Sequence, residues 1–125
     1  MTQLSYEQVR DEFKQLVDEN PDFVYRPPNG SDCFYVHVDG DNMTPGCIVG
    51  HWLHRFRGIP LYRLQGIEGN GAAPGASILG VRLSSKAGSF LSGLQTKQDS
   101  GIPWRMAFDM AVEDEAAFGS EGDEV

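Results

Sequence analysis

The sequence is poor in cysteine, in basic residues and in long apolar runs, and each shortage argues against a class of protein. Only two of its 125 residues are cysteine, which is too few for the disulfide frameworks of small secreted domains. No apolar run approaches the ~20 residues of a membrane-spanning helix. The N-terminus is polar and acidic, without the basic and apolar regions of a signal peptide. We therefore expect a cytoplasmic protein with reduced thiols and no membrane association.

Basic residues are outnumbered by acidic ones, 10 to 18, which gives a net charge of -8. This charge opposes non-specific binding to nucleic acid or to an anionic membrane. The distribution is uneven. Residues 51–98 carry six bases and one acid, residues 1–50 nine acids and three bases, and residues 99–125 eight acids and one base. A basic middle between acidic ends predicts that part of the charge is cancelled within the molecule.

The length indicates a single domain, which can bury about two thirds of the surface of its unfolded chain. Such a domain needs neither a metal nor a disulfide to fold, and no cofactor is expected. We place the globular domain at residues 1–118. The remaining residues, 119–125, read GSEGDEV and are expected to form a disordered acidic tail.

The first half of the chain predicts one helix and one hairpin. Apolar spacing favours a helix over residues 5–18, beginning at the N-cap Ser5. Two runs rich in aromatic and β-branched residues follow, at 23–26 and 33–38. The Pro-, Asn- and Gly-containing segment 27–32 separates them and predicts a hairpin with a six-residue loop.

A second helix is expected to begin at Thr44-Pro45, extend to about Arg57 and end at Gly58. At 100° per residue its apolar face would pack on Phe34 and Val36 of the preceding strand. That apolar face consists of Ile48, Val49, Trp52, Leu53 and Phe56. The opposite face carries Cys47, His51 and His54.

The second half predicts further helices around a weakly patterned centre. A helical turn is expected at 61–64, a loop at 66–75, and either a short helix or an extended segment at 76–83. Helices from Ser84 to about Gln98 and from Pro103 to about Ala116 would form an αα-hairpin. The fold class is therefore α+β, mainly α: a single small domain of about four to five helices with one short β-hairpin.

Cysteine and histidine gather in one part of the chain and suggest a metal site. Zinc prefers such ligands, in pairs two to five residues apart. However, the expected packing directs the Cys/His faces of the strand and the helix away from each other. Ordinary thiols and imidazoles are therefore the preferred interpretation over a structural metal. The candidate ligands are Cys33, His37, Cys47, His51 and His54.

Cys47 is also a candidate nucleophile. It lies at the start of the expected helix, where amide groups favour a thiolate, and His51 follows four residues later as a candidate base. A third group to orient the histidine is not identifiable. The alternative is that Cys47 is a small residue between Gly46 and Gly50 that allows close packing, and no catalytic residue is assigned.

A basic surface is the candidate binding site. It could contact phosphate, but an acidic partner or the chain's own acidic ends would explain it equally well. Its members are His51, His54, Arg55, Arg57 and Arg63. The pair of helices at residues 84–116 resembles a helix-turn-helix in outline, yet its second helix is acidic and would repel DNA. Nucleic acid is therefore an unlikely partner.

Several segments of the chain carry a resemblance to other proteins. They are NPDFVY at 20–25, CFYV at 33–36, PGCIVGHWLHRF at 45–56 and QTKQDSGIPW at 95–104. In these segments the chain resembles a group of small, uncharacterised proteins encoded by actinobacteria and their bacteriophages. The resemblance implies a phage or actinobacterial origin and a mainly helical domain, and it supplies no activity.

The sequence therefore predicts a non-enzymatic interaction or regulatory protein, plausibly a bacteriophage protein acting on an unknown host or phage protein in the host cytoplasm. The alternative is a metal- or nucleic-acid-contacting module that uses the His51/His54/Arg55 surface. Self-association into a homo-oligomer is left open.

Overall fold

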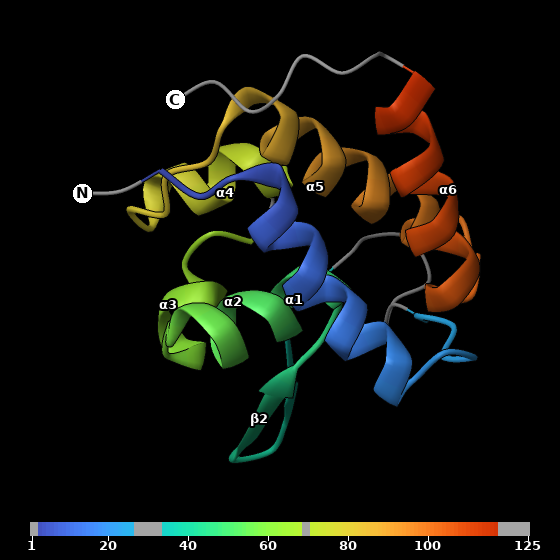
Figure 1. Cartoon of the computed structure of the whole chain (residues 1–125). Coiled ribbons are helices and arrows are strands. Elements are labelled where there is room, and N and C mark those ends of the chain that lie inside the picture. Colours follow the sequence, from blue (N-terminus) through green and yellow to red (C-terminus); the bar gives the residue numbers. More distant parts are fainter. Residues whose placement is uncertain (1–2, 27–33, 69–70, 118–125) are drawn as a thin grey trace.

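The computed structural model describes residues 3–26, 34–68 and 71–117, and these form a mainly helical domain with one two-stranded antiparallel sheet (Figure 1). The predicted class is confirmed, with six helices in the described ranges rather than four or five. The predicted acidic tail at 119–125 lies outside these ranges. The elements are α1 Tyr6–Glu19, β1 Val36–Asp39, β2 Asn42–Pro45, α2 Ile48–Arg57, α3 Leu61–Gln65, α4 Ala72–Ile78, α5 Ser85–Asp99 and α6 Trp104–Ala117.

Helix α1 lies at the centre of the fold. Figure 1 shows it between α5 and α6 on one side and α2 on the other, and it contacts all three. The Ser5 side chain caps its N-terminus by accepting a hydrogen bond from the Gln8 amide at 3.2 Å, as the sequence predicts. Its apolar face is almost fully buried and includes Val9, Phe13 and Val17. Phe13 stacks on Trp52 of α2, with 5.2 Å between the ring centroids.

The hairpin is formed by different residues from those expected. Strands β1 and β2 pair from Val36 opposite Pro45 to Asp39 opposite Asn42, leaving a two-residue loop at Gly40-Asp41. Of these two only Gly40 has a positive φ, of 64°, which is the pattern of a type II′ turn with glycine first. A two-residue loop with this geometry matches the strand twist. The loop predicted at 27–32 lies outside the described residues.

The strand predicted at residues 23–26 is absent. Carbonyl groups in this part of the chain accept hydrogen bonds from helix α6 instead of from a neighbouring strand. The Phe23 carbonyl oxygen accepts a hydrogen bond from the Trp104 amide at 2.9 Å, and the Pro21 carbonyl from the Arg105 amide at 3.0 Å. These are amides at the start of α6, which have no partner within their own helix. The segment therefore caps α6 instead of pairing in a sheet.

Helix α2 begins three residues later than predicted, because Thr44 and Pro45 belong to β2. Cys47 is its N-cap and is fully buried, although it was predicted on the face opposite the apolar one. The C-terminal end is as predicted: Gly58 adopts the left-handed conformation with φ 70°.

The apolar face predicted for α2 is confirmed in its main part. Ile48, Val49, Trp52 and Leu53 are fully buried, while Phe56 is partly buried. The prediction that one face of the preceding strand, with Phe34 and Val36, packs on this helix assumes that buried and exposed side chains alternate along the strand, and they do not. Tyr35 and Val36 are both buried and Val38 is 53% exposed. The pattern fails because regular pairing starts only at Val36, so Tyr35 lies outside the strand.

Helix α4 occupies part of a stretch that the sequence predicted to be a loop. Its proline, Pro74, lies in the first turn, where the missing amide hydrogen has no helical partner to lose. Its small residues suit a close approach to α5, and Ala72, Gly75 and Ala76 are buried. The loop prediction over 66–75 is therefore wrong in its second half. The short helix α3 confirms the turn predicted at 61–64.

Helices α5 and α6 form the predicted αα-hairpin. Ser84 caps α5 by accepting a hydrogen bond from the Ala87 amide at 3.0 Å, and Gly101 with φ 88° lies in the connection. The fully buried Gln98 links this hairpin to α2, since its Oε1 accepts the Ile48 amide at 2.8 Å. Within the described ranges no helix has the length and apolarity needed to cross a membrane.

Candidate functional site

The predicted basic surface is largely neutralised by acidic residues of α1. Arg55 donates two hydrogen bonds to Glu19, at 2.6 and 2.8 Å. Arg57 donates to Glu12 at 2.5 Å. The hydrogen bond from Arg55 lowers the pKa of Glu19, and Glu19 raises the pKa of Arg55. The alternative that the chain's own acidic residues compensate these arginines is therefore confirmed.

Glu12 has a second partner that gives it a structural role. Its Oε1 accepts the indole Nε1 hydrogen bond of the buried Trp52 at 2.7 Å, while its Oε2 accepts Arg57. The side chains of Glu12 and Arg57 are only 16% and 20% exposed. Through these two hydrogen bonds Glu12 connects α1 to α2. Because Arg57 is paired with Glu12 and mostly buried, little of its side chain is available to a ligand.

The remaining predicted members of the surface differ in their surroundings. The His54 ring nitrogen Nδ1 lies 2.9 Å from the Ile59 carbonyl oxygen, so this side chain is hydrogen-bonded to the backbone just after the C-terminal end of α2. Arg63 is exposed on α3. His51 lies edge-on against Trp104 of α6, with 5.4 Å between ring centroids. Burial lowers the pKa of His51, and the nearby His37, His54 and Arg55 lower it further.

The structure gives no support to the metal site. Among the residues it describes, no group of three or more His, Cys, Asp or Glu side chains could hold a metal ion. His37 is bonded to the Tyr25 hydroxyl at 3.0 Å. Cys47 is buried, and Cys33 lies outside the described residues. The described candidate ligands, His37, Cys47, His51 and His54, therefore do not gather into a set of three that could hold a metal ion.

The packing around Cys47 favours the interpretation as a small residue over the nucleophile. The Cys47 amide donates to the Phe34 carbonyl at 2.9 Å and the Gly46 amide to the Tyr35 carbonyl at 2.8 Å. A Cβ atom added to Gly46 or Gly50 would lie well inside 3.0 Å of these same carbonyl oxygens. The thiol is fully buried in this tight junction, which counts against reaction with a substrate.

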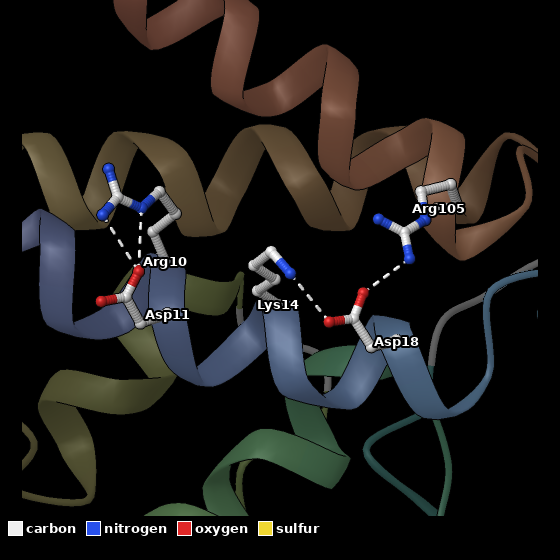
Figure 2. A network of polar contacts seen from close by, with 5 residues as sticks. All are labelled: Arg10, Asp11, Lys14, Asp18 and Arg105. Carbon is white, nitrogen blue, oxygen red and sulfur yellow. Dashed lines mark hydrogen bonds and ion pairs between the residues drawn. The ribbon is translucent and has the colours of Figure 1, made fainter.

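A second polar network pairs the cation of α6 with a carboxylate of α1. Figure 2 shows Asp18 of α1 between Lys14, at 2.8 Å, and Arg105 of α6, at 2.6 Å. Hydrogen bonds from Lys14 and then Arg105 lower the pKa of Asp18. Arg105 is the single basic residue of α6, so this pairing leaves the outer face of the helix with acidic and apolar side chains.

That outer face of α6 is the surface that the sequence reasoning missed. Met106 and Met110, one turn apart, are 55% and 36% exposed. The exposed carboxylates Asp109 and Glu113 lie on the same face, and neither has an ion pair within the part of the chain that is described. We define these four residues as the α6 face. The sequence contains a signal for this face, because at 100° per residue these four residues lie opposite the buried side of the helix.

No protein-family model, curated protein or solved structure matches the chain. Function is therefore inferred from the surfaces of the molecule itself.

Proposed function

We propose that this chain is a non-enzymatic protein-binding module that contacts its partner through the α6 face. The observation that carries this proposal is the exposure of Met106 and Met110 side by side on a helix whose opposite side is fully packed. Exposed apolar side chains within a polar surround are typical of protein interaction sites. Methionine is common at such sites because its unbranched, polarisable side chain adapts to the surface of the partner.

The charge of the α6 face indicates the chemistry of the partner. Two other charged groups of this helix are in ion pairs: Arg105 pairs with Asp18, and Asp114 pairs with Lys97 at 2.7 Å. Asp109 and Glu113 have no ion pair with any cation of the described residues. Complementary potentials govern which surfaces associate. The partner segment should therefore present apolar residues flanked by lysine or arginine.

The origin and location belong to the same proposal and rest on the sequence. The resemblance to proteins of actinobacteria and their bacteriophages supports a phage origin and a host protein as the partner, met in the host cytoplasm. The alternative, a metal- or nucleic-acid-contacting module at the His51/His54/Arg55 surface, has less support because Arg55 is paired with Glu19.

Site-specific photo-crosslinking tests the α6 face directly. A photoreactive phenylalanine analogue is placed at position 106 of the full chain, expressed in the host, and activated by light. The matched control carries the analogue at position 78, because Ile78 is 60% exposed on the distant helix α4. We expect a discrete protein adduct from position 106 and none from position 78.

The adduct should depend on the chemistry of the face. Replacing Asp109 and Glu113 together by asparagine and glutamine should weaken the crosslink, and added salt should weaken it as well, since exposed charges are screened within about 10 Å at 0.1 M salt. An adduct of equal yield from both positions, or one that the charge-neutral variant leaves unchanged, would contradict the proposal.

A further inference from the structure

A polar cleft lies between α4 and α5, on a part of the molecule that none of the predicted sites includes. Its volume is about 520 Å³, within the range of small-molecule sites. Five of its lining residues are serines, contributed by α4, by the start of α5 and by the next two turns of α5. They are Ser77, Ser84, Ser85, Ser89 and Ser92.

Arg82 is the charged residue of this cleft, and it has no acidic counterpart there. None of the lining residues is Asp or Glu, although the chain as a whole has 18 acidic and 10 basic residues. Arg82 is exposed and has no ion pair in the described ranges. This contrasts with Arg55, Arg57 and Arg105, each of which lies against a carboxylate of α1.

The backbone that carries Arg82 is held in place by the N-terminal segment. The Leu4 amide donates to the Arg82 carbonyl at 2.9 Å, and the Ser84 amide donates to the Leu4 carbonyl at 3.0 Å. These two bonds form an isolated parallel bridge between Leu4 and Leu83. The base of the arginine side chain is thus positioned at the cleft before any ligand arrives, which reduces the ordering cost of binding.

The serines differ in their availability. Ser84 caps α5, and the Ser89 hydroxyl donates to Glu115 at 2.8 Å. The side chains of Ser77, Ser85 and Ser92 are exposed and are free of hydrogen bonds to other described residues. A hydroxyl group both donates and accepts, so these three suit a ligand that combines anionic oxygens with other polar atoms.

We propose that this cleft binds a small phosphate ester, with the guanidinium of Arg82 on the phosphate group and the free serine hydroxyls on its remaining polar atoms. The planar guanidinium matches two phosphate oxygens at once, which favours phosphate over a neutral polar ligand. The apolar lining residues Ala73, Val81 and Leu83 provide a surface for a ring of the ligand. This site is independent of the α6 face.

The test follows amide chemical shifts of the full chain during titration with glucose 6-phosphate, with glucose as the uncharged comparison. We expect shifts concentrated at residues 77–92 with the phosphate ester and none of similar size with glucose. The Arg82→Gln variant should bind about tenfold to a hundredfold more weakly, since hydrogen bonds to charged groups have that effect. Arg26→Gln, which removes an exposed arginine outside the cleft, should bind as the wild type does.

A second variant narrows the cleft without unfolding the protein. A methyl group added at Gly88 would lie 3.7 Å from the Ala73 Cβ, an ordinary contact, so Gly88→Ala should fold normally and bind the ester more weakly. The proposal is overturned if the wild type shows no cleft shifts at millimolar ester, or if Arg82→Gln binds as tightly as the wild type.

Discussion

Gly50 provides a sharp test of the junction between α2 and the segment before β1. The Gly50→Ala substitution places a Cβ atom well inside 3.0 Å of the Tyr35 carbonyl oxygen, and close to two further backbone atoms of Tyr35. Backbone atoms cannot rotate away as the end of a flexible side chain can. Either α2 or the Tyr35 segment must move, although both are fully buried here.

The expected magnitude is the difference of two opposed effects. Alanine in a helix interior is favoured over glycine by about 0.8–1.0 kcal/mol. Overpacking of a tight core typically costs about 1–3 kcal/mol and occasionally more. The junction includes the Gly46 and Cys47 amide hydrogen bonds, which movement would lengthen, so we expect the higher end of that range. The net loss of unfolding free energy should be about 2 kcal/mol.

Gly93→Ala is the matched control, because it makes the same chemical change in the interior of α5. Its added Cβ would lie 3.9 Å from the Lys97 Nζ atom, at the far end of a flexible side chain. This variant should gain about 0.5–1 kcal/mol. Urea unfolding followed by far-ultraviolet circular dichroism measures both. If Gly50→Ala unfolds at the same urea concentration as the wild type or higher, the close approach is wrong.

Three further predictions concern buried polar groups. Glu12→Ala should lower the unfolding free energy by about 2–4 kcal/mol because it leaves Trp52 Nε1 and Arg57 without their acceptor, whereas Glu12→Gln should lose clearly less; equal losses in urea unfolding would contradict this. Gln98→Leu removes the acceptor of the first α2 amide and should cost about 1–3 kcal/mol in the same assay, and an unchanged midpoint would count against that bond. Burial raises the pKa of Glu68 despite two hydrogen bonds from backbone amides, so its folded form takes up a proton more readily than its unfolded form. The wild type should therefore gain stability relative to Glu68→Gln as the pH falls from neutral toward 4.5, the ordinary value for this carboxyl, and a difference that stays constant across that range would refute it.

The ion pairs explain how a chain with a basic middle presents a mainly acidic outer helix. Glu12, Asp18 and Glu19 all lie on α1, and they bind arginines of α2 and α6. The central helix therefore compensates the cations of both its neighbours. Among the described residues, Asp109 and Glu113 of the α6 face and Arg82 at the cleft are not part of these ion pairs.

The helices were predictable from the sequence where their signals are local. Ser5, Ser84 and Gly58 each bond or turn the backbone within a few residues of their own position, so their effect is already present in a short segment. The buried faces of α1 and α5 follow from helical spacing in the same way. The candidate basic residues could likewise be recognised from the sequence, because their charge does not depend on the fold.

Only the tertiary structure decided which of these groups remain available. The bonds from Arg55 and Arg57 to α1 join residues 36 and 45 positions apart, and no local pattern fixes such a pairing. Phe23 was expected within a strand, but the carbonyls of Phe23 and Pro21 accept hydrogen bonds from amides of α6 more than 80 positions later. Cys47 is buried because Gly46 and Gly50 admit the backbone of Phe34 and Tyr35. The sequence by itself determined most of the helices, the caps at Ser5, Ser84 and Gly58, and the supply of charge, since these depend on neighbouring residues. Packing between distant segments determined the hairpin, the burial of the thiol and the exposure of the α6 face, because these depend on which partner each group meets.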